Sequence, residues 1–299
     1  MKYNTLGRSN LQVSEVGFGC MSLGSDHAAN RTLLHQALDQ GITLFDTADL
    51  YQKGENEVMV GKALKSRRGE VVIATKVGNA WRPDGSGWDW VPSKEYLLEA
   101  VEHSLRRLDT DYIDLYQLHG GTLDDPIDAI IEAFELLKQQ GKIRAYGISS
   151  IRPNVIREYV QRSHIASVMM QYSLLDRRPE ESSLSLLQEH NIAVLARGSL
   201  AQGLLVNKPS KAYLNYSAEE VAQAASAVQK LSESSQRSMA EVAARFVLHH
   251  PALTSAVLGI RTGQQLADAL SIAAATPLAS AEVQALQLAL PATTYEQHR

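Results

Sequence analysis

The chain has 299 residues, a formal net charge of −4, 44% hydrophobic residues and 21% charged residues. This composition is typical of a soluble globular protein, and the acidic balance argues against a nucleic-acid partner, because surfaces that bind a duplex are usually strongly basic. The single cysteine, Cys20, excludes an intrachain disulfide. There is no apolar run of ~20 residues for a membrane span and no signal peptide, so we expect a cytoplasmic protein without a membrane partner.

The first predicted element lies near the N-terminus. Val13–Met21 predicts a short strand that opens into a glycine-rich loop. Gly17, Gly19 and Gly24 only partly match the dinucleotide fingerprint G-x-G-x-x-G, because Gly24 lies too far along the chain. Two interpretations are therefore open, a tight turn at the end of a strand and a direct contact to a cofactor.

Strand-like and helical segments alternate along the rest of the chain. The short apolar segments that predict strands are Thr43–Asp46, Val71–Lys76, Ile113–His119, Ala145–Ser149, Ser167–Gln171, Ala193–Arg197 and Ser255–Leu258. Apolar periodicity and capping residues predict helices at Asn30–Gln40, Val58–Leu64, Leu97–Leu108, Ile127–Leu137, Pro153–Val160 and Gln264–Ala274. Capping boxes at Ser217 and Ser238 open two more helices, and Asp125 is the expected N-cap of the helix that begins near Ile127.

Strict alternation of strands and helices implies parallel strands that are joined by right-handed crossovers. With the opening strand there are about eight such units, which predicts an α/β fold, a (β/α)₈ TIM barrel. We expect an N-terminal hairpin and extra helices near the C-terminus, one of them within Thr276–Leu290. A doubly wound open sheet is the alternative fold. Such a sheet usually has fewer strands, and its dinucleotide fingerprint is missing from this sequence. No linker divides the chain, so residues 1–299 are predicted to form a single domain.

In such a barrel the carboxyl ends of the strands share one rim, where active sites form. The polar residues that should meet there are Asp46 with Tyr51 beyond it, Lys76, His119, Ser149, Ser150, Gln171 and Arg197. Four of them also have a purely structural interpretation. Asp46 and Lys76 could form a structural ion pair, His119 could be a core histidine, and Tyr51 could be an ordinary surface residue. Their position at one predicted rim favours an active site.

Four of these groups form a predicted proton-transfer unit. A phenol such as Tyr51 is a poor acid at neutral pH, and the nearby ammonium of Lys76 is expected to lower its pKa. Asp46 would keep the amine charged, and a neutral His119 could orient a carbonyl oxygen or help to pass the proton. The predicted reaction converts a carbonyl into an alcohol, with Tyr51 as the general acid.

No metal site is predicted, so a reductant must come from elsewhere. His249 and His250 are adjacent on a predicted helix and point in different directions. Cys20 is interpreted as a small packed residue and not as a nucleophile. Neither feature therefore accounts for the chemistry.

Three segments resemble the signatures of the aldo-keto reductase superfamily: Phe45–Tyr51, Ala74–Lys76 and Asp114–His119. Leu6–Ser9, Gly17–Gly19 and Tyr146–Ser149 also fit, and the resemblance extends from about Tyr3 to Leu270. It implies a barrel that binds extended NADPH across the rim without a Rossmann domain. It also implies that Tyr51 is the general acid and that Asp46, Lys76 and His119 support it.

The same resemblance implies a set of cofactor contacts. Ser149 and Gln171 would hold the nicotinamide carboxamide, and Arg197 stands where many members stack a tyrosine on the ring. Arg261 would bind the adenosine 2′-phosphate, so the preference for NADPH depends mainly on this residue. The full predicted set is Gly19, Cys20, Met21, Asp46, Ser149, Ser150, Gln171, Arg197, Gly198, Ser199, Leu200, Gly203, Gly259, Arg261, Thr262 and Gln265.

The segment from Asn79 to Pro92 is a predicted loop that contains all 3 tryptophans of the chain. These either pack the loop onto the barrel or form an aromatic wall for an apolar aldehyde or ketone. We predict that Trp81 and Trp88 contact the small carbonyl substrate together with Tyr51 and His119. The tail after Leu290 is short, so an open pocket is expected.

Two other classes of function are open at this point. The chain could be an NADP(H)-binding regulatory or sensor protein that resembles the potassium-channel β-subunits. It could also be a non-redox barrel enzyme, such as a lyase or an isomerase, that uses the same acid–base groups. For the carbonyl-reducing enzyme we expect a monomer.

Overall fold

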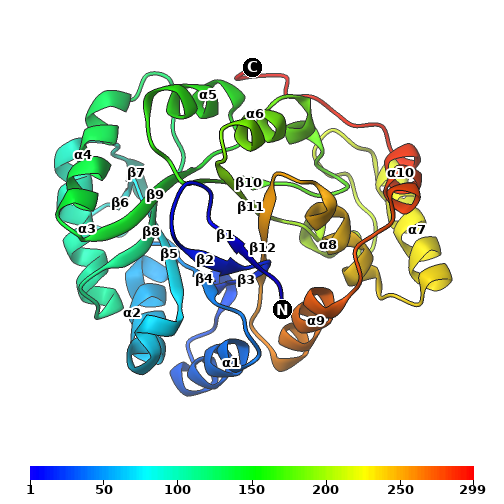
Figure 1. Cartoon of the computed structure of the whole chain (residues 1–299), viewed down its shortest axis with the longest axis horizontal. Helices are drawn as coiled ribbons and strands as arrows, with labels where there is room; N and C mark the ends of the chain where they lie inside the picture. The colour runs from blue at the N-terminus through cyan, green and yellow to red at the C-terminus, as the bar shows by residue number, and fades with distance from the viewer.

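The computed structural model describes residues 1–299, and its central feature is a closed barrel of eight parallel strands. In the order in which they pair, the strands are β10 (Ser167–Gln171), β11 (Ala193–Arg197), β12 (Leu253–Gly259), β3 (Val16–Gly19), β4 (Leu44–Asp46), β5 (Val72–Val77), β8 (Ile113–Leu118) and β9 (Ile143–Ser149). Figure 1 shows the helices arranged around this ring. The predicted (β/α)₈ barrel is confirmed, and the open sheet is not formed.

The helices connect the strands on the outside of the barrel. They are α1 (His27–Asp39), α2 (Glu55–Leu64), α3 (Lys94–Leu108), α4 (Ile127–Gln139), α5 (Pro153–Arg162), α6 (Ser183–Glu189), α7 (Ala218–Ser235), α8 (Met239–His249), α9 (Gly263–Ala274) and α10 (Ser280–Ala289). The last of them packs against α7, as expected of an additional C-terminal helix. The short α6 was not predicted. No helix is both long and apolar enough to cross a membrane.

Polar residues before the helices explain where several of them begin. The Asp26 carboxylate accepts hydrogen bonds from the backbone N–H groups of Ala28 and Ala29, so α1 begins earlier than its apolar periodicity indicated. Ser217 and Ser238 form capping boxes at the starts of α7 and α8. These two predicted helix starts are confirmed.

The predicted strand Val13–Met21 is interrupted in the structure. The N-terminal hairpin of β1 (Tyr3–Thr5) and β2 (Gln12–Ser14) ends at Ser14, and the barrel strand β3 begins at Val16. Gly17 lies within β3, where a Cβ atom would be only 3.0 Å from the Leu44 side chain of β4. This glycine therefore allows two strands to pack closely, and it does not form the tight turn that was considered.

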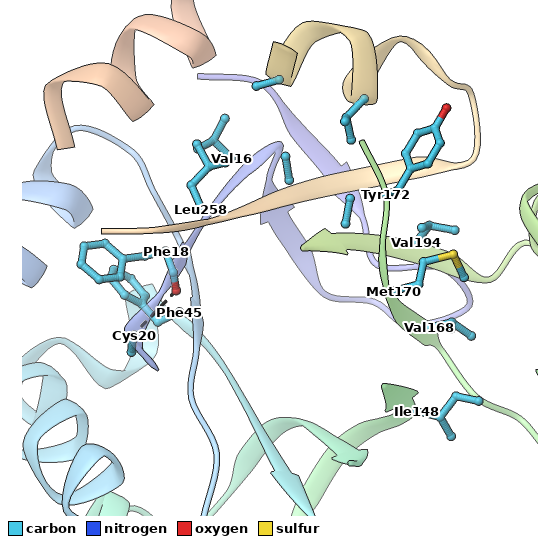
Figure 2. Packing of buried hydrophobic residues seen from close by; sticks show 14 of the residues in the cluster. Val16, Phe18, Cys20, Phe45, Ile148, Val168, Met170, Tyr172, Val194 and Leu258 are labelled. Atoms are coloured by element: carbon cyan, nitrogen blue, oxygen red, sulfur yellow. Dashed lines mark hydrogen bonds between the residues drawn. The ribbon is translucent and has the colours of Figure 1, made fainter. Parts of the chain in front are cut away.

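Buried apolar side chains form two separate clusters. The larger one contains 71 buried residues from the strands and the surrounding helices. Figure 2 shows part of it, with Phe18 and Phe45 stacked at 5.7 Å between ring centroids and Cys20 beside them. The smaller cluster fills the barrel interior and includes Leu6 and Val13 of the N-terminal hairpin. In Figure 1 this hairpin lies across the end of the barrel that faces the viewer.

Alternation of side chains along the strands explains why polar groups gather at the other end. Residues two positions apart on a strand face the same side. Four interior apolar residues are each followed, two positions later, by a predicted site residue: Leu44 by Asp46, Ala74 by Lys76, Met169 by Gln171 and Leu195 by Arg197. The alternation that directs apolar side chains into the lower interior of the barrel therefore also directs these polar side chains into its mouth.

The segment after Leu290 packs against loops at this mouth. The backbone N–H of Asn154, at the start of α5, donates to the His298 carbonyl (2.9 Å). The guanidinium of Arg178 lies 4.8 Å from the ring centroid of Tyr295, which is buried. The C-terminal segment thus packs against the face of the barrel that carries the site.

Candidate active site

Lys76 is the centre of the predicted proton-transfer unit. Its ammonium nitrogen Nζ donates hydrogen bonds to Asp46 Oδ2 (2.8 Å), the Thr47 carbonyl (2.7 Å) and Tyr51 Oη (3.2 Å). The side chain is 1% exposed, and a charge buried this deeply needs such partners. The phenol and the amine that were predicted to meet are therefore within hydrogen-bonding distance.

His119 completes this group of side chains. Its backbone N–H donates to the Val77 carbonyl (2.7 Å), which holds the residue just beyond β8 and against β5. Its ring meets the Tyr51 ring edge to face, with 6.1 Å between the centroids. All four predicted catalytic side chains thus come together at the barrel mouth.

The environment of Tyr51 changes one expectation. Burial raises the pKa of the Tyr51 hydroxyl above that of a free phenol, and the Lys76 ammonium offsets this effect only in part. The prediction of a net lowered pKa is therefore wrong for this structure, and the hydroxyl keeps its proton at neutral pH. Burial alone would lower the pKa of Lys76, but Asp46 and Tyr51 raise it, so the amine is charged.

The imidazole of His119 is neutral, as the predicted role requires. Burial lowers the pKa of His119 to about 3, and the positive charges of Lys76 and Arg197 act in the same direction. A neutral imidazole can donate from one ring nitrogen and accept at the other. It is therefore suited to orienting a carbonyl oxygen.

A groove of about 650 Å³ lies between the ends of β11, β12 and β3 and the helices α8 and α9. Seven of the predicted cofactor-binding residues line it: Met21, Gly198, Ser199, Leu200, Gly203, Gly259 and Gln265. Ser199 is 1% exposed and its hydroxyl has no hydrogen-bond partner within the protein. A donor without a partner at the wall of this groove suits the phosphate oxygens of a dinucleotide.

One edge of this groove is formed by the start of α9. The Thr262 hydroxyl caps the helix by accepting from the Gln265 N–H (3.2 Å), and Gln265 Oε1 accepts from the Arg261 N–H (2.9 Å). The Arg261 side chain is exposed. Because a helix N-terminus favours negative charge, this arrangement suits a phosphate.

Gln171 and Arg197 lie next to each other, on the paired strands β10 and β11. The Gln171 side chain donates through Nε2 to Asp176 (2.9 Å) and to Tyr213 Oη (3.1 Å), and its Oε1 accepts from Arg197 Nη1 (3.2 Å). Its amide is therefore fixed in orientation. A Cβ atom on Gly198 would lie 3.3 Å from Gln171 Cγ, so a glycine there leaves the amide in place.

The remaining predicted cofactor residues occupy different environments. Ser149 ends β9, whereas the buried Ser150 accepts a bond from the Arg152 N–H (3.2 Å) through its hydroxyl. Gly19 ends β3. Cys20 is completely buried in the larger apolar cluster, where its thiol donates to the Phe18 carbonyl (3.8 Å), and only Met21 of this predicted trio lines the groove.

The predicted tryptophan loop is in fact a hairpin of β6 (Asn79–Trp81) and β7 (Trp88–Trp90), in which Trp81 pairs with Trp88. Trp90 Nε1 donates to Asp125 Oδ1 (3.0 Å). Asp125 thus anchors the hairpin, and the prediction that it caps α4 is wrong, since Pro126 occupies the N-cap without a side-chain bond.

The two tryptophans predicted to contact substrate differ in exposure. Trp88 is 48% exposed, whereas the indole N–H of Trp81 is buried without a partner. The Lys53 ammonium lies 5.2 Å from the ring centroid of Trp81 and joins the hairpin to the turn that carries Tyr51. The hairpin therefore stands beside the catalytic group.

Some residues of the site were missed in the sequence. Gln117 is fully buried, is paired in register with Lys76, and has no partner for either amide atom. Its position two residues after the interior Leu115 could have revealed it. Asn207, Lys208 and Met239 line the groove, but no local pattern marks them, because the fold alone brings these segments together.

Comparison with known proteins agrees with this geometry. The model of the Aldo/keto reductase family matches residues 15–290. The chain is 49% identical over 308 residues to "Uncharacterized oxidoreductase YqkF" of Bacillus subtilis (strain 168), with 100% of both chains covered. It is 36% identical over 234 residues to the "NADH-specific methylglyoxal reductase" of Escherichia coli (strain K12), with 72% of each covered.

Solved structures give the same result. The holo form of aldo-keto reductase AKR11C1 from Bacillus halodurans matches with a TM-score of 0.93 and 52% identity, covering 100% of this chain and 99% of that one. Its apo form matches with a TM-score of 0.85 and 49% identity, with the same coverage. From the family match and this identity over the full length, we conclude that the chain belongs to the aldo/keto reductase family.

Proposed function

We propose that this protein reduces aldehydes and ketones to alcohols with NADPH and that Tyr51 is the general acid. Membership of the family implies NAD(P)H-dependent carbonyl reduction; NADPH as the cofactor and the role of Tyr51 are the finer part of the proposal. The observation that carries it is the contact of Lys76 Nζ with both Asp46 and Tyr51 at the mouth of the barrel.

The chain's own residues have distinct roles in this reaction. When bound, the dinucleotide supplies the hydride. Tyr51 donates its proton to the carbonyl oxygen, and the hydrogen bond from Lys76 stabilises the phenolate that is left. Asp46 holds the ammonium in position, and the neutral imidazole of His119 orients the carbonyl group. Trp81 and Trp88 would contact the apolar part of the substrate.

The groove supports the proposed cofactor site. Ser199, with its unpartnered buried hydroxyl, and the backbone around Gly198 and Gly203 would hold the phosphates. Gln171 and Ser149 would hold the carboxamide, and Arg261 the 2′-phosphate. A relative is named as NADH-specific, so the choice between the two dinucleotides needs a direct test. We also propose that the protein acts in the cytoplasm, and that it acts as a monomer because one chain contains every proposed group of the site.

The test is turnover of a carbonyl compound by the purified protein. NADPH or NADH is mixed with methylglyoxal or benzaldehyde, and loss of nicotinamide absorbance is followed. Tyr51→Phe should lower kcat by about 100-fold or more, the range of general acid catalysis. Tyr3→Phe, an exposed residue of the N-terminal hairpin, is the matched control and should leave kcat unchanged. Binding without turnover would favour a sensor, and no binding of either dinucleotide would contradict the proposal.

A further inference from the structure

Asn56, in the first turn of α2, connects two parts of the site from inside the protein. It is completely buried, and its Nδ2 donates to the Cys20 carbonyl (2.9 Å) while its Oδ1 accepts from the Thr47 hydroxyl (2.7 Å). The Thr47 carbonyl accepts in turn from Lys76 Nζ (2.7 Å). Three hydrogen bonds, joined through the side chain of Asn56 and the covalent structure of Thr47, therefore connect Cys20 to the catalytic ammonium.

Gln52 makes a second and independent connection. It follows Tyr51 directly, and its Nε2 donates to the Leu23 carbonyl (2.7 Å). Its backbone is left-handed, with φ of 52°, and the next residue, Lys53, has φ of 56°. Such a conformation is unfavourable for residues other than glycine and persists only where surrounding contacts hold it. The bond to Leu23 is one of these contacts.

Both connections end on the same segment, Cys20–Leu23, which follows β3. This segment carries Met21, which is 64% exposed and lines the groove of about 650 Å³. The wall of the groove is therefore joined by two side chains to the turn that carries Tyr51 and to Lys76. Packed and hydrogen-bonded contacts of this kind can carry free-energy coupling between two sites.

We propose that Gln52 and Asn56 are positioning residues, which hold the Tyr51 turn and Lys76 against the groove wall so that a dinucleotide in the groove also orders the catalytic turn. This inference rests on the proposed function, because the groove must bind the dinucleotide. Gln52 and Asn56 themselves lie outside the group that would touch the reacting atoms, and they act through Tyr51 and Lys76.

Gln52→Gly is the variant that tests the inference. Glycine adopts the left-handed conformation without strain, so the fold should persist, and only the side-chain bond to Leu23 is lost. The matched control is Gln236→Gly. Gln236 is also a left-handed glutamine, with φ of 56° at the end of α7, but its side chain makes no hydrogen bond within the protein. Both variants relieve the strain of a left-handed backbone, but only Gln52→Gly removes a hydrogen bond to the groove wall.

Hydrogen exchange with saturating NADPH, and separately NADH, provides the measurement. In the wild type, dinucleotide should slow exchange both at residues 20–23 and at residues 50–56. In Gln52→Gly, slowing at residues 20–23 should remain, slowing at residues 50–56 should be reduced, and kcat should fall about threefold to tenfold, the range for one hydrogen bond. The melting temperature should not fall. Gln236→Gly should behave as the wild type in exchange and in kcat.

Each outcome decides the matter. Equal slowing at residues 50–56 and equal kcat in the wild type and Gln52→Gly would overturn the inference, as would wild-type slowing confined to residues 20–23. The proposed function would survive both results. No slowing at residues 20–23 with either dinucleotide would refute the proposed cofactor site and this inference together. Asn56→Asp keeps an acceptor for Thr47 but removes the donor to Cys20, so it should also reduce both kcat and the slowing at residues 50–56, and wild-type values of both would overturn the role of Asn56.

Discussion

His119 links the chemistry of the site to the stability of the fold. Its pKa of about 3 in the folded state lies below the ordinary value of 6.5. Between these two values the unfolded chain binds more protons than the folded one, so the free energy of unfolding decreases as the pH falls through this window. His119→Gln should remove this contribution, which amounts to at most about 1.4 kcal/mol per pH unit.

Urea unfolding of the wild type and His119→Gln across this pH window measures the effect. His249→Gln, at an exposed residue that ends α8, is the matched histidine-to-glutamine control. If His119→Gln has the same dependence of stability on pH as the wild type, the imidazole is not held neutral by the fold.

Arg261 should decide between the two dinucleotides. Its exposed side chain makes no hydrogen bond within the protein, so its removal should cost little stability. Loss of a charge-assisted contact to the 2′-phosphate should weaken NADPH by about tenfold or more in Arg261→Ala, while NADH changes by no more than about twofold. Fluorescence titration with both dinucleotides tests this, and Arg261→Lys should recover part of the loss. Equal weakening of both would contradict the assignment.

At the scale of elements, the β6–β7 hairpin is a separately anchored unit. Trp90 fixes it to Asp125, whereas Trp88 is half exposed and free to contact a ligand. Trp88→Ala should therefore lower kcat/KM for benzaldehyde by about tenfold relative to methylglyoxal, because a flat apolar contact is lost. The ratio of the two kcat/KM values is the measurement, with Trp88→Phe as the variant that keeps an aromatic ring. An unchanged ratio would contradict a contact between Trp88 and the substrate.

The elements differ in how well their sequence signals identify them. β10 and β11 match the predicted segments residue for residue, since both are short apolar runs between turn signals. α6 has only 7 residues, too few for a helical period to be recognised. The hairpin around Trp81 was missed because each of its strands has only 3 residues, too few for the alternation of a strand to be recognised.

The features of the site also differ in how well the sequence could predict them. The meeting of Tyr51 with Lys76 could be predicted, because the barrel brings strand ends together whatever their separation in the chain. The direction in which the Tyr51 pKa is shifted could not be predicted, because it depends on burial, which no motif encodes. The burial of the Cys20 thiol likewise depends on how the segment after β3 packs against the larger apolar cluster, which no local pattern encodes.

At the scale of the whole molecule, stability and chemistry occupy opposite ends of the barrel. Leu6 and Val13 close the interior at the end away from Tyr51. Leu6→Ala should lower the free energy of unfolding by about 2–5 kcal/mol through the cavity it leaves, with kcat unchanged at moderate temperature. Denaturant unfolding should show one cooperative transition for residues 1–299, as proposed for a single domain. Leu288→Ala, at a residue that is 77% exposed, should be nearly neutral.

The burial of Cys20 has a practical consequence for attaching probes. Burial raises the pKa of this thiol well above its ordinary value, so it should resist maleimide reagents at neutral pH. Asn10→Cys, at the exposed tip of the N-terminal hairpin, would therefore supply the one reactive sulfur of the chain. A fluorophore or an electrode coupled there would sit on the closed end of the barrel and leave the open mouth facing solution.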